Sequence, residues 1–347
     1  MPVGFGYGLI TCQRSPSDPR TDTELYAEAL ELSREAEELG FDSVWVSEHH
    51  FVDDGYLPSP IPLCAAIAAV TERVAVGTAL ALAPLYHPLR LAEDVAVVDL
   101  ISGGRTVLGL GIGWREEEFE AIGVPLDERG ARLEDAVATL RQAWAEGLTT
   151  GTERSPYPDV PVTPKPARPG GPPIWIGALA GPAIRRAGRI GDGFMATEVT
   201  PEAFGEQVAA ARAERERAGL DPDTMVASLH LPTFVWDGED AWDLVKEHHH
   251  YVAWKYEDME AARHRAAGPA PKPSLTEELE DELRDQIVLG TPEEVAERIA
   301  AYRDAAGGEV HYIARLYWPG MDPEVQRRST ALFAEEVIPL LGDEGER

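Results

Sequence analysis

The feature that most constrains this chain is an alternation of short apolar runs with amphipathic stretches along almost its whole length. Apolar runs are typical of strands buried on both faces, and apolar residues at helical spacing are typical of helices that cover a sheet. We expect strands at residues 3–10, 43–47, 74–81, 106–112, 173–178, 193–197, 225–235 and 310–315. We expect helices at residues 23–39, 62–71, 89–101, 130–146, 182–189, 201–218, 292–305 and 323–341.

Strands and helices that alternate in this way predict an α/β fold in which a parallel sheet closes as a (β/α)8 TIM barrel. The alternative is an open, doubly wound sheet. A length of 347 residues suits one such barrel with insertions, so we expect a single domain over residues 1–347.

The composition disfavours several classes of partner. With 61 acidic and 31 basic residues the net charge is −30, which disfavours binding to nucleic acids and to anionic membranes. Cys12 and Cys64 are the only cysteines, too few for a disulfide scaffold or a zinc ribbon. No basic segment precedes the first apolar stretch, and no apolar run approaches the length of a membrane helix, so we expect a cytoplasmic protein.

Two segments interrupt the alternation. Residues 149–171 are rich in Pro and Gly and are expected to form a long loop. Residues 238–289 form an insertion between the seventh strand and the seventh helix, with helical and Pro-rich parts. In a barrel this insertion lies at the C-terminal face, where active sites are found, so we interpret it as a lid. The alternative is a helical subdomain that supports only folding or dimerisation.

Candidate chemistry follows the second strand, where the chain reads Ser47-Glu48-His49-His50-Phe51. Histidine exchanges a proton near neutral pH, and a neighbouring carboxylate can orient its ring. We take His49 and His50 as candidate catalytic residues; the alternative is a pair that only binds loop backbone. The run His248-His249-His250, with His264 beyond it, is interpreted as part of a solvated helix, and we expect no metal site.

Small residues follow three other strands. Gly77 and its neighbours, and the alternate glycines of residues 109–113, leave space for a flat ligand or for close packing inside the barrel. Residues 177–182 turn from the fifth strand into a helix, where free N–H groups can bind an anion. A tight packing turn is the equal alternative at this position.

These motifs together resemble the bacterial luciferase-like monooxygenases, over roughly residues 3–341. The resemblance breaks down within 149–171 and 238–289. It rests on the order of SEHHF, GTALALAPLYHPLRLAEDVAVVDLISGGR, LGLGIGWREEEFEAIGV, IWIGALAGPAIRRAGRIGDGF, LGTPEEVAERIAAYRDAAGG and ALFAEEVIPLL.

The resemblance implies a barrel that binds a flavin at its C-terminal end. Family members take reduced FMN from a separate reductase or use the deazaflavin coenzyme F420, and the resemblance also implies a homodimer. His49 matches the catalytic histidine of the family, His50 matches its neighbour, and the bond between Ala79 and Leu80 falls where the family often has a cis peptide. The residues assigned to cofactor binding are Glu48, Ala79, Leu80, Gly111, Ile112, Gly177, Ala178, Leu179, Ala180 and Gly181.

The chain departs from the luciferase-type pattern at the mouth of the fourth strand, where a cysteine and an arginine are replaced by Gly111 and Ile112. A phosphate group would lose one arginine there, and Arg115, Arg185 or Arg186 are the candidate replacements.

Three functions follow as expectations. The first is an oxidoreductase that uses reduced FMN and O2 to oxygenate a small organic substrate, with His49 as acid or base. The second is a hydride-transferring oxidoreductase that uses F420. The third, from a different class, is a non-catalytic flavin-binding barrel.

Overall fold

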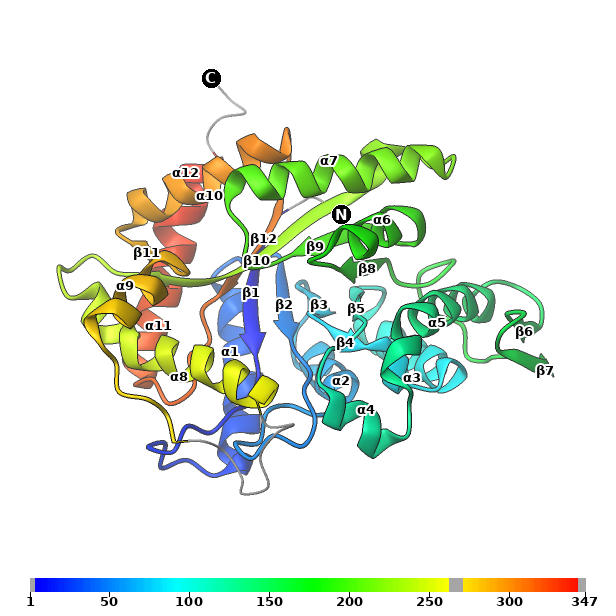
Figure 1. Ribbon diagram of the computed structural model, residues 1–347, viewed down its shortest axis with the longest axis horizontal. Helices are drawn as coiled ribbons and strands as arrows, with labels where there is room; N and C mark the ends of the chain where they lie inside the picture. The colour runs from blue at the N-terminus through cyan, green and yellow to red at the C-terminus, as the bar shows by residue number, and fades with distance from the viewer. Residues whose placement is uncertain (1–3, 262–270, 343–347) are drawn as a thin grey trace.

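The computed structural model describes residues 4–261 and 271–342, and it contains a closed barrel of eight parallel strands (Figure 1). Neighbouring strands pair in chain order, and β12 pairs with β1 to close the cylinder. The barrel strands are β1 Phe5–Ile10, β2 Ser43–Val46, β3 Ala75–Thr78, β5 Thr106–Gly111, β8 Ile174–Gly177, β9 Gly193–Ala196, β10 Val226–Val235 and β12 His311–Arg315. The predicted TIM barrel and its eight strands are confirmed.

The predicted helices between these strands are also present, and they surround the barrel (Figure 1). They are α1 Asp22–Glu38, α2 Pro60–Val70, α3 Pro88–Ser102, α5 Arg129–Trp144, α6 Gly181–Ile190, α7 Pro201–Arg217, α10 Pro292–Ala306 and α11 Pro323–Leu332. After α11 the chain continues through a short π-helix, Phe333–Val337, into α12, Ile338–Gly342. Six of the eight begin with Pro at the first or second helical position, where its missing N–H costs no helical hydrogen bond.

Several short elements were not predicted. The expected loop at 149–171 contains an antiparallel hairpin of β6, Thr149–Gly151, and β7, Pro156–Val160. The expected third strand is interrupted after Thr78 and resumes as β4, Ala81–Leu82. The other additions are α4 Glu116–Ile122, β11 Val288–Gly290 and the 3₁₀ turns Ala83–Leu85, Leu126–Glu128 and Pro222–Thr224. Elements this short carry too few residues to show a period in the sequence.

The N-terminal half of the barrel interior is filled by aromatic rings. Trp45 and Trp175 stack with ring centroids 5.1 Å apart, and the His311 ring packs edge-on against both. A Cβ at Gly77 would lie 2.4 Å from the Trp45 ring, and a Cβ at Gly193 would lie 2.6 Å from the Trp175 ring. Gly77 therefore serves close packing, the second of the two interpretations given above.

A cavity of about 800 Å³ lies at the N-terminal end of the barrel, lined by the first residues of several strands, among them Ser43, Ala75 and Val107. It lies on the far side of the ring layer from the segment that contains His49 and His50. Catalytic residues of TIM barrels come from the C-terminal end, so this cavity is not taken as the active site.

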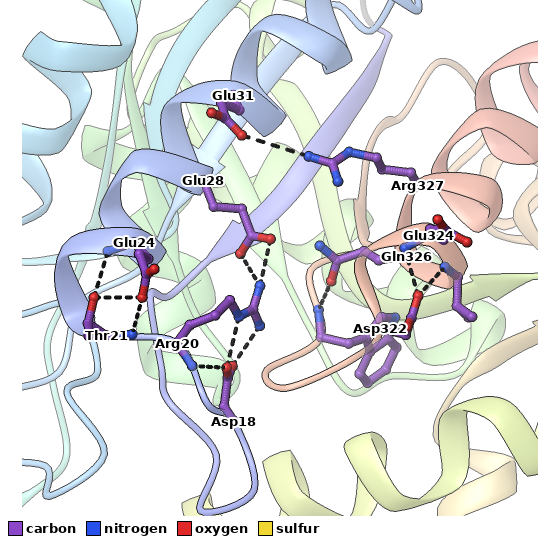
Figure 2. A network of polar contacts seen from close by, with 12 residues as sticks. Asp18, Arg20, Thr21, Glu24, Glu28, Glu31, Asp322, Glu324, Gln326 and Arg327 are labelled. Atoms are coloured by element: carbon purple, nitrogen blue, oxygen red, sulfur yellow. Dashed lines mark hydrogen bonds and ion pairs between the residues drawn. The ribbon is translucent and has the colours of Figure 1, made fainter.

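Ion pairs hold the long β1–α1 connection at the C-terminal end of the barrel (Figure 2). Arg20 binds Asp18 and Glu28 at once, with N–O distances of 2.6 Å to each. Thr21 and Glu24 form a capping box that fixes the start of α1. On the neighbouring helix α11, the Gln326 side chain accepts the backbone N–H of Trp318 at 2.8 Å, which fixes the segment that follows β12 (Figure 2).

The insertion at 238–289 contains two helices, α8 Ala241–Ala261 and α9 Glu277–Asp285, as its sequence predicted. It leaves the barrel after β10 and returns at β11, which extends the sheet by pairing with β10. Among the described residues, no helix has the length and apolarity needed to cross a membrane.

Candidate active site

His49 lies in the loop that follows β2 and is buried at the C-terminal end of the barrel. Its Nδ1 atom is 3.0 Å from Oε1 of Glu118, a fully buried carboxylate in the first turn of α4. A carboxylate that accepts a hydrogen bond from Nδ1–H fixes the ring orientation and leaves Nε2 to exchange protons. The pair is therefore suited to acid–base catalysis.

Aromatic side chains surround the His49 ring. Tyr56, Trp114 and Tyr256 each present a ring edge-on to it, with centroids 4.9, 5.7 and 5.6 Å away. The hydroxyl groups of Tyr56 and Tyr256 are 2.9 Å apart, and Tyr56 also donates to Ser47 at 3.0 Å. Tyr256 belongs to α8, so the insertion contributes directly to the surroundings of His49.

His50 points to a different partner. Its Nε2 lies 2.7 Å from Oε1 of Glu48, and Glu48 also accepts from the Tyr86 hydroxyl and from the backbone N–H of Leu82. Burial lowers the pKa of His50, but the hydrogen bond and charge of Glu48 outweigh it, so the pKa is raised. Glu48 thus connects the loop after β2 to β4, and the structure gives it no free oxygen aimed at a ligand.

Several of the small residues predicted to bind the cofactor lie around the side chain of Leu80. The peptide bond between Ala79 and Leu80 is cis, and the Leu80 side chain extends over the ends of β5 and β8. A Cβ at Gly111 would lie 3.0 Å from Leu80, and a Cβ at Gly177 would lie 2.1 Å from it. Glycine at these positions therefore makes room for Leu80; Ile112 follows Gly111 and is partly buried.

The turn that precedes α6 is open at the surface. Leu179 is 60% exposed, and Ala180 and Gly181 are also exposed. Ala178 is buried and pairs with β9 through its N–H, whereas the N–H groups of Leu179 and Ala180 have no backbone acceptor among the described residues. The turn therefore offers N–H donors to a ligand at a helix N-terminus.

The three candidate replacement arginines lie in different places. Arg115 is buried and donates to the carbonyl of His50. Arg186 forms an ion pair with Glu134 at 2.9 Å. Arg185 is exposed, and its Nη1 lies 3.5 Å from the position a Cβ would take at Gly181, so it is the arginine that lies at the turn.

Helix α8 is attached to the loop between β2 and α2. Tyr251 donates to Asp54 at 2.8 Å, and the buried Lys255 pairs with Asp53. Asp54 also accepts from Gln13 in the loop after β1 at 2.8 Å. The insertion therefore lies across the mouth of the barrel and is held there by polar contacts.

The three adjacent histidines of α8 diverge. His248 contacts the carbonyl of Pro319, His249 contacts the carbonyl of Leu283, and His250 contacts Lys272. His264 lies outside the described residues. In the part of the chain that is described, no group of three His, Cys, Asp or Glu side chains is arranged to hold a metal ion.

Sequence reasoning missed Glu118 and Tyr56. Glu118 stands in a run of three glutamates, and nothing in the sequence distinguishes it from Glu116 and Glu117. Its place just before Phe119, which packs into the core, is the one signal that it faces inward.

Comparison with known proteins identifies the family of this chain. The family model for luciferase-like monooxygenases matches residues 5–308. A flavin-dependent trigonelline monooxygenase, oxygenase component, from Acinetobacter baylyi is 27% identical, with 97% of this chain and 96% of the relative covered. An F420-dependent glucose-6-phosphate dehydrogenase from Nakamurella multipartita is 32% identical, with 98% and 97% covered.

A solved structure shares this fold. The monooxygenase RslO1 from Streptomyces bottropensis superposes with a TM-score of 0.79 at 27% identity, covering 97% of this chain and 99% of that one. The family includes enzymes that use FMN and enzymes that use F420. With a family model that spans most of the barrel and a 32% identical relative over nearly the full length, this chain belongs to the luciferase-like monooxygenase family and is an oxidoreductase.

Proposed function

We propose that this chain is the oxygenase component of a two-component monooxygenase that uses reduced FMN and O2 to oxygenate a small organic substrate. The observation that carries the proposal is the buried His49–Glu118 pair at the barrel mouth, 3.0 Å from nitrogen to oxygen. His49 is the acid or base that moves protons through Nε2, and Glu118 holds its ring. The 27% identical trigonelline monooxygenase is itself named as an oxygenase component, which supports a separate flavin reductase as partner.

The residues at the mouth fit a flavin. The exposed N–H groups of Leu179 and Ala180, with Arg185 beside them, suit a phosphate group. The Leu80 side chain lies over Gly111 and Gly177 and offers an apolar surface for the flavin ring. When bound there, reduced FMN would supply the electrons that activate O2.

We further propose that residues 238–289 act as a lid. Tyr256 of α8 contacts both Tyr56 and the His49 ring, so closure of α8 completes the wall around His49. A closed, aromatic site excludes water from the reaction.

The test measures O2 uptake by the purified protein with chemically reduced FMN and no reductase. We expect FMN-dependent uptake and a fall in substrate oxygenation of about 10²- to 10⁴-fold for His49→Ala, with FMN binding retained. His87→Ala, at an exposed position of the β4–α3 connection, is the matched control. No oxygenated product from any substrate of a broad panel, despite FMN binding, would refute the proposal.

The second candidate is an F420-dependent hydride transfer, and the 32% identical glucose-6-phosphate dehydrogenase is the observation that favours it. Titration with reduced FMN and with reduced F420 in parallel separates the two. Tighter binding of F420, with substrate-dependent F420 reduction and no O2 uptake, would assign the second function.

A further inference from the structure

Arg315 is the last residue of β12, and the alternation of that strand directs its side chain into the barrel. His311 packs against Trp45 in the interior ring layer, and Ile313 belongs to the same interior cluster. Tyr312 and Ala314 face outward into the core between strands and helices. Successive strand residues point to opposite faces, so Arg315 lies inside the barrel, above the ring layer at the C-terminal end.

The Arg315 guanidinium is buried and has no counter-ion among the described residues. The residue is 6% exposed, and neither Nε nor Nη2 has a hydrogen-bond partner among the described residues. By contrast, the equally buried Arg215 donates to two backbone carbonyls and to Thr224. Residues 262–270, which follow α8, contain no Asp or Glu.

A buried, unpaired charge is strongly unfavourable in a folded protein. This chain has 61 acidic residues and 31 basic ones, so carboxylates that could pair with an arginine are abundant in its sequence. The unpaired state of Arg315 is therefore costly to stability, and binding of an anion at this point would remove the cost.

The two unpartnered atoms, Nε and Nη2, limit which class of anion can bind to Arg315. The Nε–H and one Nη2–H bond of a guanidinium are parallel and lie on the same edge of its plane. That edge matches the two oxygens of a single carboxylate, which accepts both hydrogen bonds at once. The free edge of Arg315 is this one.

The surroundings of Arg315 connect it to His49. Its guanidinium lies 5.8 Å from the Tyr256 ring centroid, and the same ring is 5.6 Å from that of His49. His230, on the neighbouring strand β10, faces the interior as well. Burial, and then the charge of Arg315, lowers the pKa of His230 to about 3, so His230 is neutral and adds no competing positive charge.

We propose that Arg315 binds a carboxylate of the substrate, so that the substrates of this enzyme are small organic acids held with the reacting carbon between Arg315 and His49. The inference rests on the proposed function for the reaction, but the anion site itself belongs to the folded chain and requires no turnover. The other source of an anion at this position is the reduced cofactor, and the experiment distinguishes the two.

The test titrates the purified protein, without cofactor, with acetate, hexanoate and benzoate, and with the neutral analogue benzamide. Binding is followed by tryptophan fluorescence and by the thermal midpoint. We expect at least one carboxylate to bind in the millimolar range and benzoate to bind at least about tenfold more tightly than benzamide. Arg315→Met should abolish this preference, and Arg315→Lys should retain part of it.

Arg217→Met, in the exposed last turn of α7 at the opposite end of the barrel, removes the same charge and should leave carboxylate binding unchanged. Without ligand, Arg315→Met should melt at the same temperature as the parent or higher, because an unpaired buried charge is gone. Equal binding of benzoate and benzamide, no binding of any of the three acids, or unchanged binding by Arg315→Met would overturn the proposal. So would loss of reduced FMN binding in Arg315→Met with carboxylate binding retained, since the anion would then be the cofactor.

Failure of the proposed function gives a different experimental result from failure of the carboxylate site. Absence of O2 uptake with reduced FMN, together with Arg315-dependent carboxylate binding, would refute the monooxygenase and keep the organic acid site.

Discussion

Oε1 of Glu118 accepts two hydrogen bonds from neighbouring residues of one loop, from Nδ1 of His49 at 3.0 Å and from the backbone N–H of His50 at 2.8 Å. A single carboxylate oxygen thus fixes both the ring and the main chain of the candidate catalytic segment. Its second oxygen, Oε2, is buried and has no hydrogen-bond partner in residues 4–261 and 271–342. The arrangement makes Glu118 a positioning residue whose removal should disturb the His49 ring and the backbone of His50.

Glu118→Gln keeps the size of the side chain and removes its charge. We expect turnover to fall at least about tenfold, because the His49 ring loses the carboxylate that orients it. The measurement is the pH dependence of kcat and of kcat/KM. Glu120→Gln, at an exposed position of the same helix, is the control; equal profiles for the two variants would exclude a role for Glu118.

The His50–Glu48 pair should make stability depend on pH. The folded-state pKa of His50 is raised, so its contribution is fully present below the unfolded pKa of about 6.5 and is lost as pH rises through the folded pKa. We expect the difference in unfolding free energy between the parent and His50→Gln to be larger at about pH 6 than at about pH 9. Denaturant titrations at both pH values give the difference, and in a Glu48→Gln background it should no longer change with pH.

Asp54 should control the attachment of α8. It accepts hydrogen bonds from Gln13, from the backbone of Tyr56 and from Tyr251, so Asp54→Ala should lower the unfolding free energy by about 3 kcal/mol. Hydrogen exchange should accelerate in α8 more than in the barrel strands. Asp243→Ala, an exposed aspartate of the same helix, should do neither. Uniform acceleration throughout the barrel would mean that Asp54 supports the whole fold and not the insertion.

Gly177 and Leu80 should show mutual dependence. In Gly177→Ala the new methyl group would lie 2.1 Å from Leu80, so we expect a loss of about 1–3 kcal/mol in stability and weaker flavin binding. Leu80→Ala in the same chain should recover part of both, which a double-mutant cycle measures. Gly308→Ala, where a Cβ meets nothing within 4 Å, is the control.

The barrel strands were predictable because they are short runs of mainly apolar residues, such as the segment 106–112. This pattern is typical of a strand that is buried on both faces. The hairpin β6–β7 was not, because its strands are short and β7 contains Pro156 and Pro158.

The candidate site was predictable where its residues belong to ordered motifs, as with His49 and with Gly177. Glu118 was not, because three consecutive glutamates differ only in the direction that α4 gives each side chain. Arg315 carried a signal that was overlooked: it is a charged residue in the interior register of a buried strand.

The packed rings of Trp45, Trp175 and His311 have a kinetic consequence for the proposed reaction, because they close the barrel beneath the proposed reaction chamber. Such a chamber is closed at its base, so the product has to leave by the same path through which the substrate entered. Arrival and departure are then successive events, and each turnover includes a waiting time that no improvement at His49 would shorten.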